Sequence, residues 1–212
     1  MTKALIFDLD NTLYPESAYF QAIFSQLSQQ FNLEPERFAF LFKDFDRIRF
    51  SQRDIFGFAL EQAACFSKEY HEALFQLFTQ IDTHLIPYDG VQACIDQAIE
   101  AGLAIGVLTN GQVLAQTQKW NCLQLDRKAN IHFSAARSLG ADKPASSTYE
   151  AFLNGMGFQP QDCLFIGDRY ANDLDWGIQQ GGKGILIHSH EEVAGVPQVR
   201  DFFELMKEIE RL

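Results

Sequence analysis

The chain has 212 residues, which suits one domain with an insertion or two small domains. A net charge of −11 and a pI of about 4.8 argue against binding to nucleic-acid polymers or anionic membranes, since both need a basic surface. No apolar run is long enough to span a bilayer and no secretory signal is present, so we expect a cytoplasmic protein. The four cysteines are widely spaced, which favours reduced thiols.

Short apolar runs and helical patterns alternate over most of the chain. Five runs have the length of buried parallel strands: Ala4–Phe7, Leu103–Leu108, Ile131–Phe133, Leu164–Ile166 and Ile185–Ile187. The predicted helices are Val91–Ala101, Thr148–Met156, Asp173–Gln180 and Phe202–Leu212. This alternation predicts an α/β fold with a Rossmann-like parallel sheet core and helices on both faces.

Residues 15–85 differ from the rest and predict a separate helical domain inserted after the first strand. Thirteen of the 20 phenylalanines lie in this segment, which is too many for a linker. Apolar residues recur at helical spacing within Phe38–Ile48 and Leu74–Ile81. We therefore predict an α/β core made of residues 1–14 and 86–212, and a helical domain made of residues 15–85.

Asp8 and Asp10 follow the first predicted strand directly. Alternation along a strand would send both carboxylates to the same face. Two such groups at a strand end repel each other and are costly to bury unless a cation or a proton relieves them. The pair therefore suggests a metal site, shared-proton chemistry or both, with a solvated turn as the ordinary alternative.

Polar side chains also follow three later strands. Thr109 and Asn110 end the second, Lys143 comes after the third, and Asp168 and Asp173 come after the fourth. In parallel α/β sheets the ligand lies outside the carboxyl ends of the strands, so these residues are expected to meet there. Carboxylates suit Mg²⁺, and an anion that bridges a metal and a lysine is most simply a phosphate. Alone, each residue has an ordinary explanation, such as a turn, an exposed lysine or a helix N-cap.

Four stretches in this order resemble the motifs of the haloacid dehalogenase superfamily. They are Phe-Asp-Leu-Asp-Asn-Thr-Leu-Tyr from Phe7, Leu-Thr-Asn-Gly from Leu108, Lys-Pro from Lys143 and Gly-Asp-Arg-Tyr-Ala-Asn-Asp from Gly167. The likeness covers residues 5 to about 182, and the helical domain is similar to the cap of the subfamily with an insertion after the first motif. The first motif most resembles the pyrimidine 5′-nucleotidases and related small phosphate-ester phosphatases.

The resemblance implies a Mg²⁺-dependent phosphatase that hydrolyses a small phosphate monoester, such as a nucleoside monophosphate or a sugar phosphate. Asp8 would attack phosphorus and form an aspartyl-phosphate. Asp10 would protonate the leaving oxygen and then activate water. Since an acid and a nucleophile need different protonation states, their surroundings must separate the two pKa values, with Asp10 keeping a proton.

The other motif residues are implied to bind the phosphoryl group and the metal. Thr109 would hydrogen-bond the phosphoryl oxygens with Asn110 nearby, and Lys143 would pair with their charge and with Asp8. The implied Mg²⁺ ligands are Asp8, Asp10 through its backbone carbonyl, Asp168 directly, and Asp173 through water or from behind the direct ligands.

Three positions extend or depart from the family pattern. Asn11 stands where many relatives carry glycine, but asparagine tolerates a left-handed backbone and permits a tight turn. Arg169 stands where a small polar residue is usual; we expect it to form a salt bridge with Asp173, with a contact to the substrate as the alternative. Arg49 continues an apolar stripe of the helical domain and is the candidate for binding a second anionic group of the substrate.

Several other functions are weighed against the phosphatase. A phosphomutase uses the same four motifs and remains an alternative function. A 2-haloacid dehalogenase has no need of Asp10, because a halide leaves without a proton. A receiver-type phospho-accepting domain is opposed by the helical insertion, and a non-catalytic interaction protein by the presence of every catalytic side chain. We expect a small phosphorylated metabolite as partner, no nucleic-acid polymer, no membrane, and a monomer or homodimer.

Overall fold

The chain divides into two compact units in the computed structural model, which describes residues 2–126 and 128–211. The first unit takes in the chain up to Pro15 and from Ile86 onward, and the second is Glu16–Leu85. Across these described ranges, no helix has both the length and the hydrophobicity needed to cross a membrane.

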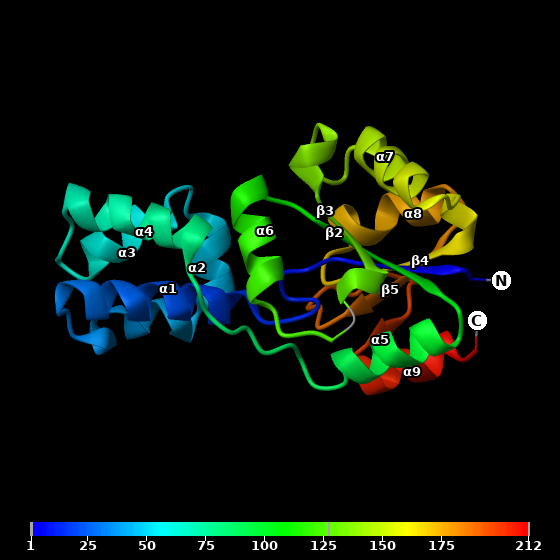
Figure 1. The fold of residues 1–212 in the computed structure, drawn as a ribbon, viewed down its shortest axis with the longest axis horizontal. Helices are drawn as coiled ribbons and strands as arrows, with labels where there is room; N and C mark the ends of the chain where they lie inside the picture. The colour runs from blue at the N-terminus through cyan, green and yellow to red at the C-terminus, as the bar shows by residue number, and fades with distance from the viewer. Residues whose placement is uncertain (1, 127, 212) are drawn as a thin grey trace. The chain divides into compact units, whose positions relative to one another are not determined.

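A six-stranded sheet with parallel pairing throughout is the centre of the first unit (Figure 1). The strand order is β3-β2-β1-β4-β5-β6. The strands are β1 (Ala4–Phe7), β2 (Ala104–Thr109), β3 (Ile131–Ala135), β4 (Cys163–Gly167), β5 (Lys183–Ile187) and β6 (Gln198–Val199). The predicted α/β fold is confirmed. The sequence pattern missed β6, because two residues are too few to show a period.

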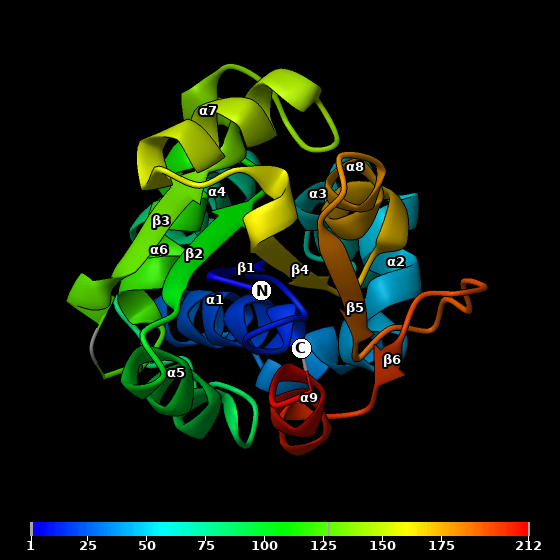
Figure 2. The same cartoon turned by 90° about the vertical axis from the view of Figure 1, so that its right-hand side faces the viewer.

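Helices cover both faces of this sheet, with α7 and α8 on one side and α5 and α9 on the other (Figure 2). The α-helices of the first unit are α5 (Val91–Glu100), α6 (Val113–Cys122), α7 (Ser146–Met156), α8 (Asp175–Gln179) and α9 (Phe202–Ile209). Four shorter helical turns are η2 (Lys128–Asn130), η3 (Ala136–Leu139), η4 (Pro160–Asp162) and the π-helical η5 (Tyr170–Leu174). Leu212, the predicted end of the last helix, lies outside the described residues.

The predicted helix Asp173–Gln180 begins earlier than expected. The π-helical turn η5 precedes α8, so Asp173 lies inside a helical turn instead of capping one. Its backbone N–H donates to the carbonyl of Arg169 (2.9 Å). This placement turns the Asp173 side chain back toward the end of β4.

The strand order places β1 in the middle of the sheet, with β2 on one side and β4 on the other. Every residue of β1 and of β4 is buried, which explains why both read as unbroken apolar runs. The chain leaves β1 toward β2 and β3, and later returns to β4 on the opposite side. Such a reversal opens a crevice at the carboxyl ends of the strands.

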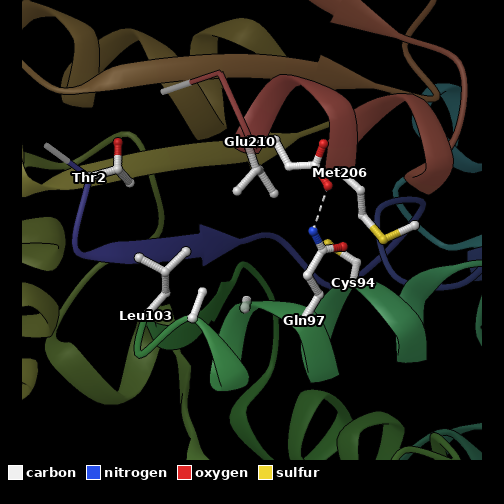
Figure 3. Close-up of a pocket in the computed structure, with 9 residues that line it drawn as sticks. Thr2, Cys94, Gln97, Leu103, Met206 and Glu210 are labelled. Carbon is white, nitrogen blue, oxygen red and sulfur yellow. Dashed lines mark hydrogen bonds between the residues drawn. The ribbon is translucent and has the colours of Figure 1, made fainter.

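At the amino ends of the strands, α5 and α9 border an apolar pocket of about 220 Å³ (Figure 3). Thr2 and Leu103, which precede β1 and β2, line its floor, and Gln97 Nε2 donates to Glu210 Oε1 above it (2.9 Å). Burial raises the pKa of Cys94 in its wall to about 12, so this thiol stays protonated. The pocket lies at the edge of the sheet away from the predicted site.

The second unit is a bundle of helices around an aromatic core. Its elements are α1 (Glu16–Phe31), the 3₁₀ helix η1 (Pro35–Lys43), α2 (Phe45–Ser51), α3 (Ile55–Gln62) and α4 (Lys68–Gln80). The rings of Phe24 and Phe38 lie 4.7 Å apart, and those of Phe20 and Phe45 lie 5.1 Å apart. The predicted stripe from Phe38 to Ile48 is not one helix, because the backbone breaks at Asp44 between η1 and α2.

Candidate active site

The loop after β1 is a tight turn that separates Asp8 from Asp10. The backbone N–H of Asp8 continues the sheet by donating to Ile166 of β4 (2.9 Å). The chain then turns through Asn11, whose φ of +58° is left-handed, so the predicted tight turn is confirmed. Because β1 ends at Phe7, strand alternation does not extend to Asp10. Strand alternation is therefore not what places Asp10, and the two carboxylates have different hydrogen-bond partners.

Asp8, Asp168 and Asp173 form a group that we call the acidic trio. Each offers a carboxylate oxygen, and these oxygens all lie within 4.8 Å of one another. The trio is assembled from the ends of two neighbouring strands, β1 and β4, and from η5. Gly167 permits the closeness, since a Cβ there would lie 2.4 Å from Asp173 Oδ2.

Lys143 reaches the acidic trio from the loop after β3. Its Nζ donates to Asp8 Oδ1 (2.6 Å) and to Asp173 Oδ1 (2.7 Å), and the residue is 5% exposed. Asn110 holds the backbone of this lysine, donating Nδ2 to its carbonyl (2.9 Å) and accepting its N–H at Oδ1 (2.7 Å). Asn110 was predicted beside the phosphoryl group, and its side chain here orients Lys143. Thr109 is buried at the end of β2, and its hydrogen bond to a phosphoryl oxygen stays a prediction.

The electrostatics of the acidic trio favour a cation. Burial raises the pKa of Asp8 well above its usual value despite the charge of Lys143, and Asp173 and Asp168 raise it further. Burial, followed by the charge of Asp173, raises the pKa of Asp168 to about 7 against the opposing charges of Arg169 and Lys143. Three crowded carboxylates facing one ammonium group are a donor set that suits Mg²⁺. The residues present therefore fit the implied metal.

Asp10 lies in a second network that contains a buried lysine. Its Oδ2 accepts from Lys119 Nζ (2.7 Å) and Gln116 Nε2 (3.1 Å), and its Oδ1 accepts from Tyr14 Oη (2.6 Å). Lys119 is 0% exposed. Burial opposes ionisation of Asp10, but the charge of Lys119 and the hydrogen bonds from Lys119, Tyr14 and Gln116 outweigh it and lower the pKa of Asp10.

Without metal or substrate, the pKa of Asp8 is raised and the pKa of Asp10 is lowered. Lys119 and its neighbouring hydrogen-bond donors, which the sequence did not indicate, favour the carboxylate of Asp10 in this state. That Asp10 keeps a proton in the site loaded with Mg²⁺ and substrate stays a prediction. The Asp10 side chain stands apart from the acidic trio among the described residues. Its implied metal contact through the backbone carbonyl stays a prediction.

Sequence reasoning missed Gln116 and Lys119 of α6. Their spacing of three residues places them on the same helix face, directly after the Thr-Asn-Gly turn, and that spacing was the available signal. A lysine in a polar stretch is ordinarily exposed, so the pattern favoured solvent. Tyr14 ends the first motif, but no signal in the sequence indicated its contact with Asp10.

The two arginines singled out from the sequence each lie near a carboxylate. Arg169 Nε lies 4.0 Å from Asp168 Oδ2, whereas a salt bridge with Asp173 was predicted. Asp173 Oδ2 accepts the backbone N–H of Arg169 instead (3.1 Å). Arg49 lies in the helical unit, where its Nε is 3.4 Å from Glu16 Oε1. A contact of Arg49 with substrate stays a prediction.

The family is decided by the sequence model of the haloacid dehalogenase-like hydrolases, which matches residues 2–181. The chain belongs to this family. The predicted superfamily is thereby confirmed, and the protein is a haloacid dehalogenase-like hydrolase.

Curated relatives and solved structures of the family resemble this hydrolase over most of its length. Glyceraldehyde 3-phosphate phosphatase of Methanothermobacter thermautotrophicus is 24% identical over 209 residues, covering 89% of this chain and 87% of that protein. The enzyme of the same name from Methanopyrus kandleri is 25% identical over 195 residues, covering 82% and 78%. A dehalogenase solved with an intermediate complex has a TM-score of 0.66 at 18% identity, over 98% of this chain and 96% of that one, and so shares the fold. These relatives do not support the narrower likeness to pyrimidine 5′-nucleotidases.

Proposed function

We propose that this hydrolase is a Mg²⁺-dependent phosphatase that acts on a small phosphate monoester through an aspartyl-phosphate on Asp8. The observation that carries the proposal is the presence of two partly buried carboxylates on one loop in different surroundings, Asp8 in the acidic trio and Asp10 beside Lys119. The names of the two curated relatives support a phosphate ester and add triose phosphates to the sugar phosphates and nucleoside monophosphates considered from the sequence.

In the first proposed step, a carboxylate oxygen of Asp8 attacks phosphorus and the bond from phosphorus to the leaving oxygen breaks. The leaving oxygen takes a proton from Asp10. Lys143 balances the negative charge shared by Asp8 and the phosphoryl group, and Thr109 donates a hydrogen bond to a phosphoryl oxygen. Mg²⁺, when held by the acidic trio, supplies further positive charge at the phosphoryl oxygens.

In the second proposed step, water attacks the phosphorus of the aspartyl-phosphate. The bond from phosphorus to Asp8 breaks, inorganic phosphate leaves, and Asp10 takes the proton that the water loses. The lowered pKa of Asp10 suits this role as a base. For the first step, the negative charge of an incoming phosphate would oppose that lowering and help Asp10 to take up a proton.

The helical unit is proposed to act as the cap that selects the substrate, with Arg49 as the candidate contact for a second anionic group. A phosphomutase remains the second candidate, because the proposed site would form the same phospho-aspartate. A dehalogenase is disfavoured: it would attack carbon and release halide, which leaves without a proton and gives Asp10 no task.

A phosphate-release screen tests the proposal. Triose phosphates, sugar phosphates, nucleoside monophosphates, phosphoglycolate and p-nitrophenyl phosphate would be offered with Mg²⁺ or EDTA to the wild type and to Asp8→Asn. We expect Mg²⁺-dependent release by the wild type and none by the variant. No release from any ester would contradict a phosphatase, halide release from a 2-haloacid would favour the dehalogenase, and conversion of one hexose phosphate into another without release would favour the mutase.

A further inference from the structure

One face of α6 is turned toward the loop that carries Asp10. Gln116 and Lys119 are both buried, at 4% and 0% exposure, although a helix of this composition ordinarily points such side chains to water. Both donate to the same atom, Asp10 Oδ2. A buried ammonium group needs an anion beside it, and the Asp10 carboxylate supplies one at 2.7 Å from Lys119 Nζ.

Gln116 links this contact to the rest of the site. Its Nε2 donates to Asn110 O (2.6 Å) as well as to Asp10 Oδ2 (3.1 Å), and because both neighbours are acceptors, the amide has only one orientation that satisfies them. The amide passes close to Gly111, where a Cβ would lie 2.5 Å from it and φ is +132°. Glycine is therefore required at Gly111 for this approach.

Asn110 completes the link, because its side chain holds the backbone of Lys143 through two hydrogen bonds. A continuous chain of contacts thus runs from Lys143, beside Asp8, through Asn110 and Gln116 to Asp10. Lys119 adds the charge that balances Asp10, and Tyr14 fixes the other carboxylate oxygen. The two carboxylates of the loop are therefore held by separate sets of donors that share the Thr-Asn-Gly turn.

We propose that Lys119 and Gln116 are positioning residues, which hold the Asp10 carboxylate where it exchanges a proton with the leaving oxygen and with water. This inference rests on the proposed phosphatase function. Neither residue is required to touch the substrate. If they act through Asp10, their loss matters only while Asp10 is present and matters most for a leaving group that needs a proton.

The kinetic test is a double-mutant cycle with Asp10→Asn, Lys119→Met and the pair, assayed on phenyl phosphate and p-nitrophenyl phosphate with Mg²⁺. Phenol is the poorer leaving group, with a pKa of about 10, as for tyrosine. We expect Lys119→Met to lower kcat on phenyl phosphate about 10- to 100-fold with little change in KM, and to lower it several-fold less on p-nitrophenyl phosphate. In the Asp10→Asn background the same substitution should cost less than about twofold. Gln116→Met should follow the same pattern with a smaller effect.

Lys128→Met is the matched control. Lys128 is also partly buried near the end of α6, where its Nζ donates to Trp120 O (2.6 Å), and within the described part of the chain it contacts neither Asp10 nor the acidic trio. Its substitution should lower Tm without changing the ratio of the two kcat values. Equal losses on both esters, or losses that multiply in the double variant, would overturn the positioning role.

A second readout separates this inference from the proposed function. The Tm of the same four proteins is measured without substrate, and we expect the shifts of Asp10→Asn and Lys119→Met to be strongly non-additive, because each removes the partner of the other. A wild type that hydrolyses no ester would overturn the phosphatase and, with it, the catalytic side of the inference. Additive Tm shifts would show that the pair is not coupled, whatever the activity.

Discussion

Asp8 and Asp10 are separated by one residue, yet the charges around them have opposite signs. Negative side chains predominate around Asp8, whereas a positive side chain faces Asp10. Asp8 lies among two further carboxylates and shares one lysine with Asp173, so its ionised form is disfavoured until more positive charge arrives. Asp10 accepts from Lys119, a fully buried ammonium group, and from two neutral donors. One short loop therefore places Asp8 in an acidic group that suits a cation and places the Asp10 carboxylate against a cationic side chain.

The largest effect is expected from Asp8→Asn, which removes the proposed nucleophile. We expect kcat to fall at least ~10³-fold on every ester, irrespective of the leaving group. Asp10→Asn should instead lower kcat more on phenyl phosphate than on p-nitrophenyl phosphate. The reason is that Asp10 is the proposed proton donor, and the poorer leaving group needs the proton more. Steady-state assays on both esters decide this, with circular dichroism to verify folding. The same dependence on leaving group in both variants would contradict different roles for the two carboxylates.

Lys143→Met should cause the next largest loss of activity. The Lys143 ammonium group contacts Asp8 and Asp173 of the acidic trio. The substitution leaves Asp8 and Asp173 without their shared ammonium group, and we expect a loss of ~10²-fold or more in kcat. The variant should also unfold at a lower temperature in EDTA, since breaking a buried ion pair by removing one partner typically costs about 3–5 kcal/mol. Added Mg²⁺ should recover part of this stability. A fall in activity with an unchanged Tm in EDTA would contradict the ion-pair geometry.

The acidic trio predicts a pH-dependent stabilisation by Mg²⁺. The pKa of Asp168 is raised to about 7 in the folded protein, above its ordinary value of about 4 in an unfolded chain. The folded state therefore holds this proton more tightly, so the stability it contributes is present below about pH 4 and is lost as the pH rises through about 7. The pH range of this loss depends on the charged groups that face Asp168. These are the carboxylates of Asp8 and Asp173 and the cations of Lys143 and Arg169.

Mg²⁺ should offset that loss, because the ionised trio is the proposed metal site. We expect the rise in Tm on adding saturating Mg²⁺ to be about 5 °C or more near pH 8 and clearly smaller near pH 5. Thermal denaturation at both pH values, with Mg²⁺ or EDTA, measures it. Asp168→Asn is the control and should lose most of the difference. A Mg²⁺ effect that is the same at both pH values would argue against the trio as the metal site.

The smallest predicted effect is that of Tyr14→Phe, which deletes one neutral donor from Asp10. The hydroxyl donates to Asp10 Oδ1 at 2.6 Å, and a single hydrogen bond to a charged group is worth about 1.5–3 kcal/mol. We expect kcat to fall about tenfold, and more on phenyl phosphate than on p-nitrophenyl phosphate. Tyr19→Phe makes the same chemical change in the helical unit, where the hydroxyl donates to Phe78 O (2.8 Å), and should alter Tm but not kcat.

The sequence by itself determined the type of the core. Runs such as Ala4–Phe7 and Leu164–Ile166 are apolar throughout because both faces of a central parallel strand are buried, and no tertiary information is needed to recognise them. The residues that meet in the acidic trio could be predicted for a related reason. Parallel strands bring their carboxyl ends to one edge of the sheet, so their order along the chain is enough to predict the meeting.

Only the tertiary structure decided what surrounds Asp10. Lys119 lies 109 positions along the chain from Asp10, on a helix whose polar composition favours solvent exposure. Likewise, the backbone break at Asp44 and the π-helical turn at Tyr170–Leu174 leave no period in the local pattern. The physical reason is that burial of a charge depends on a partner supplied from elsewhere in the fold, and a local pattern records which residues neighbour in sequence but not which charges face each other in space.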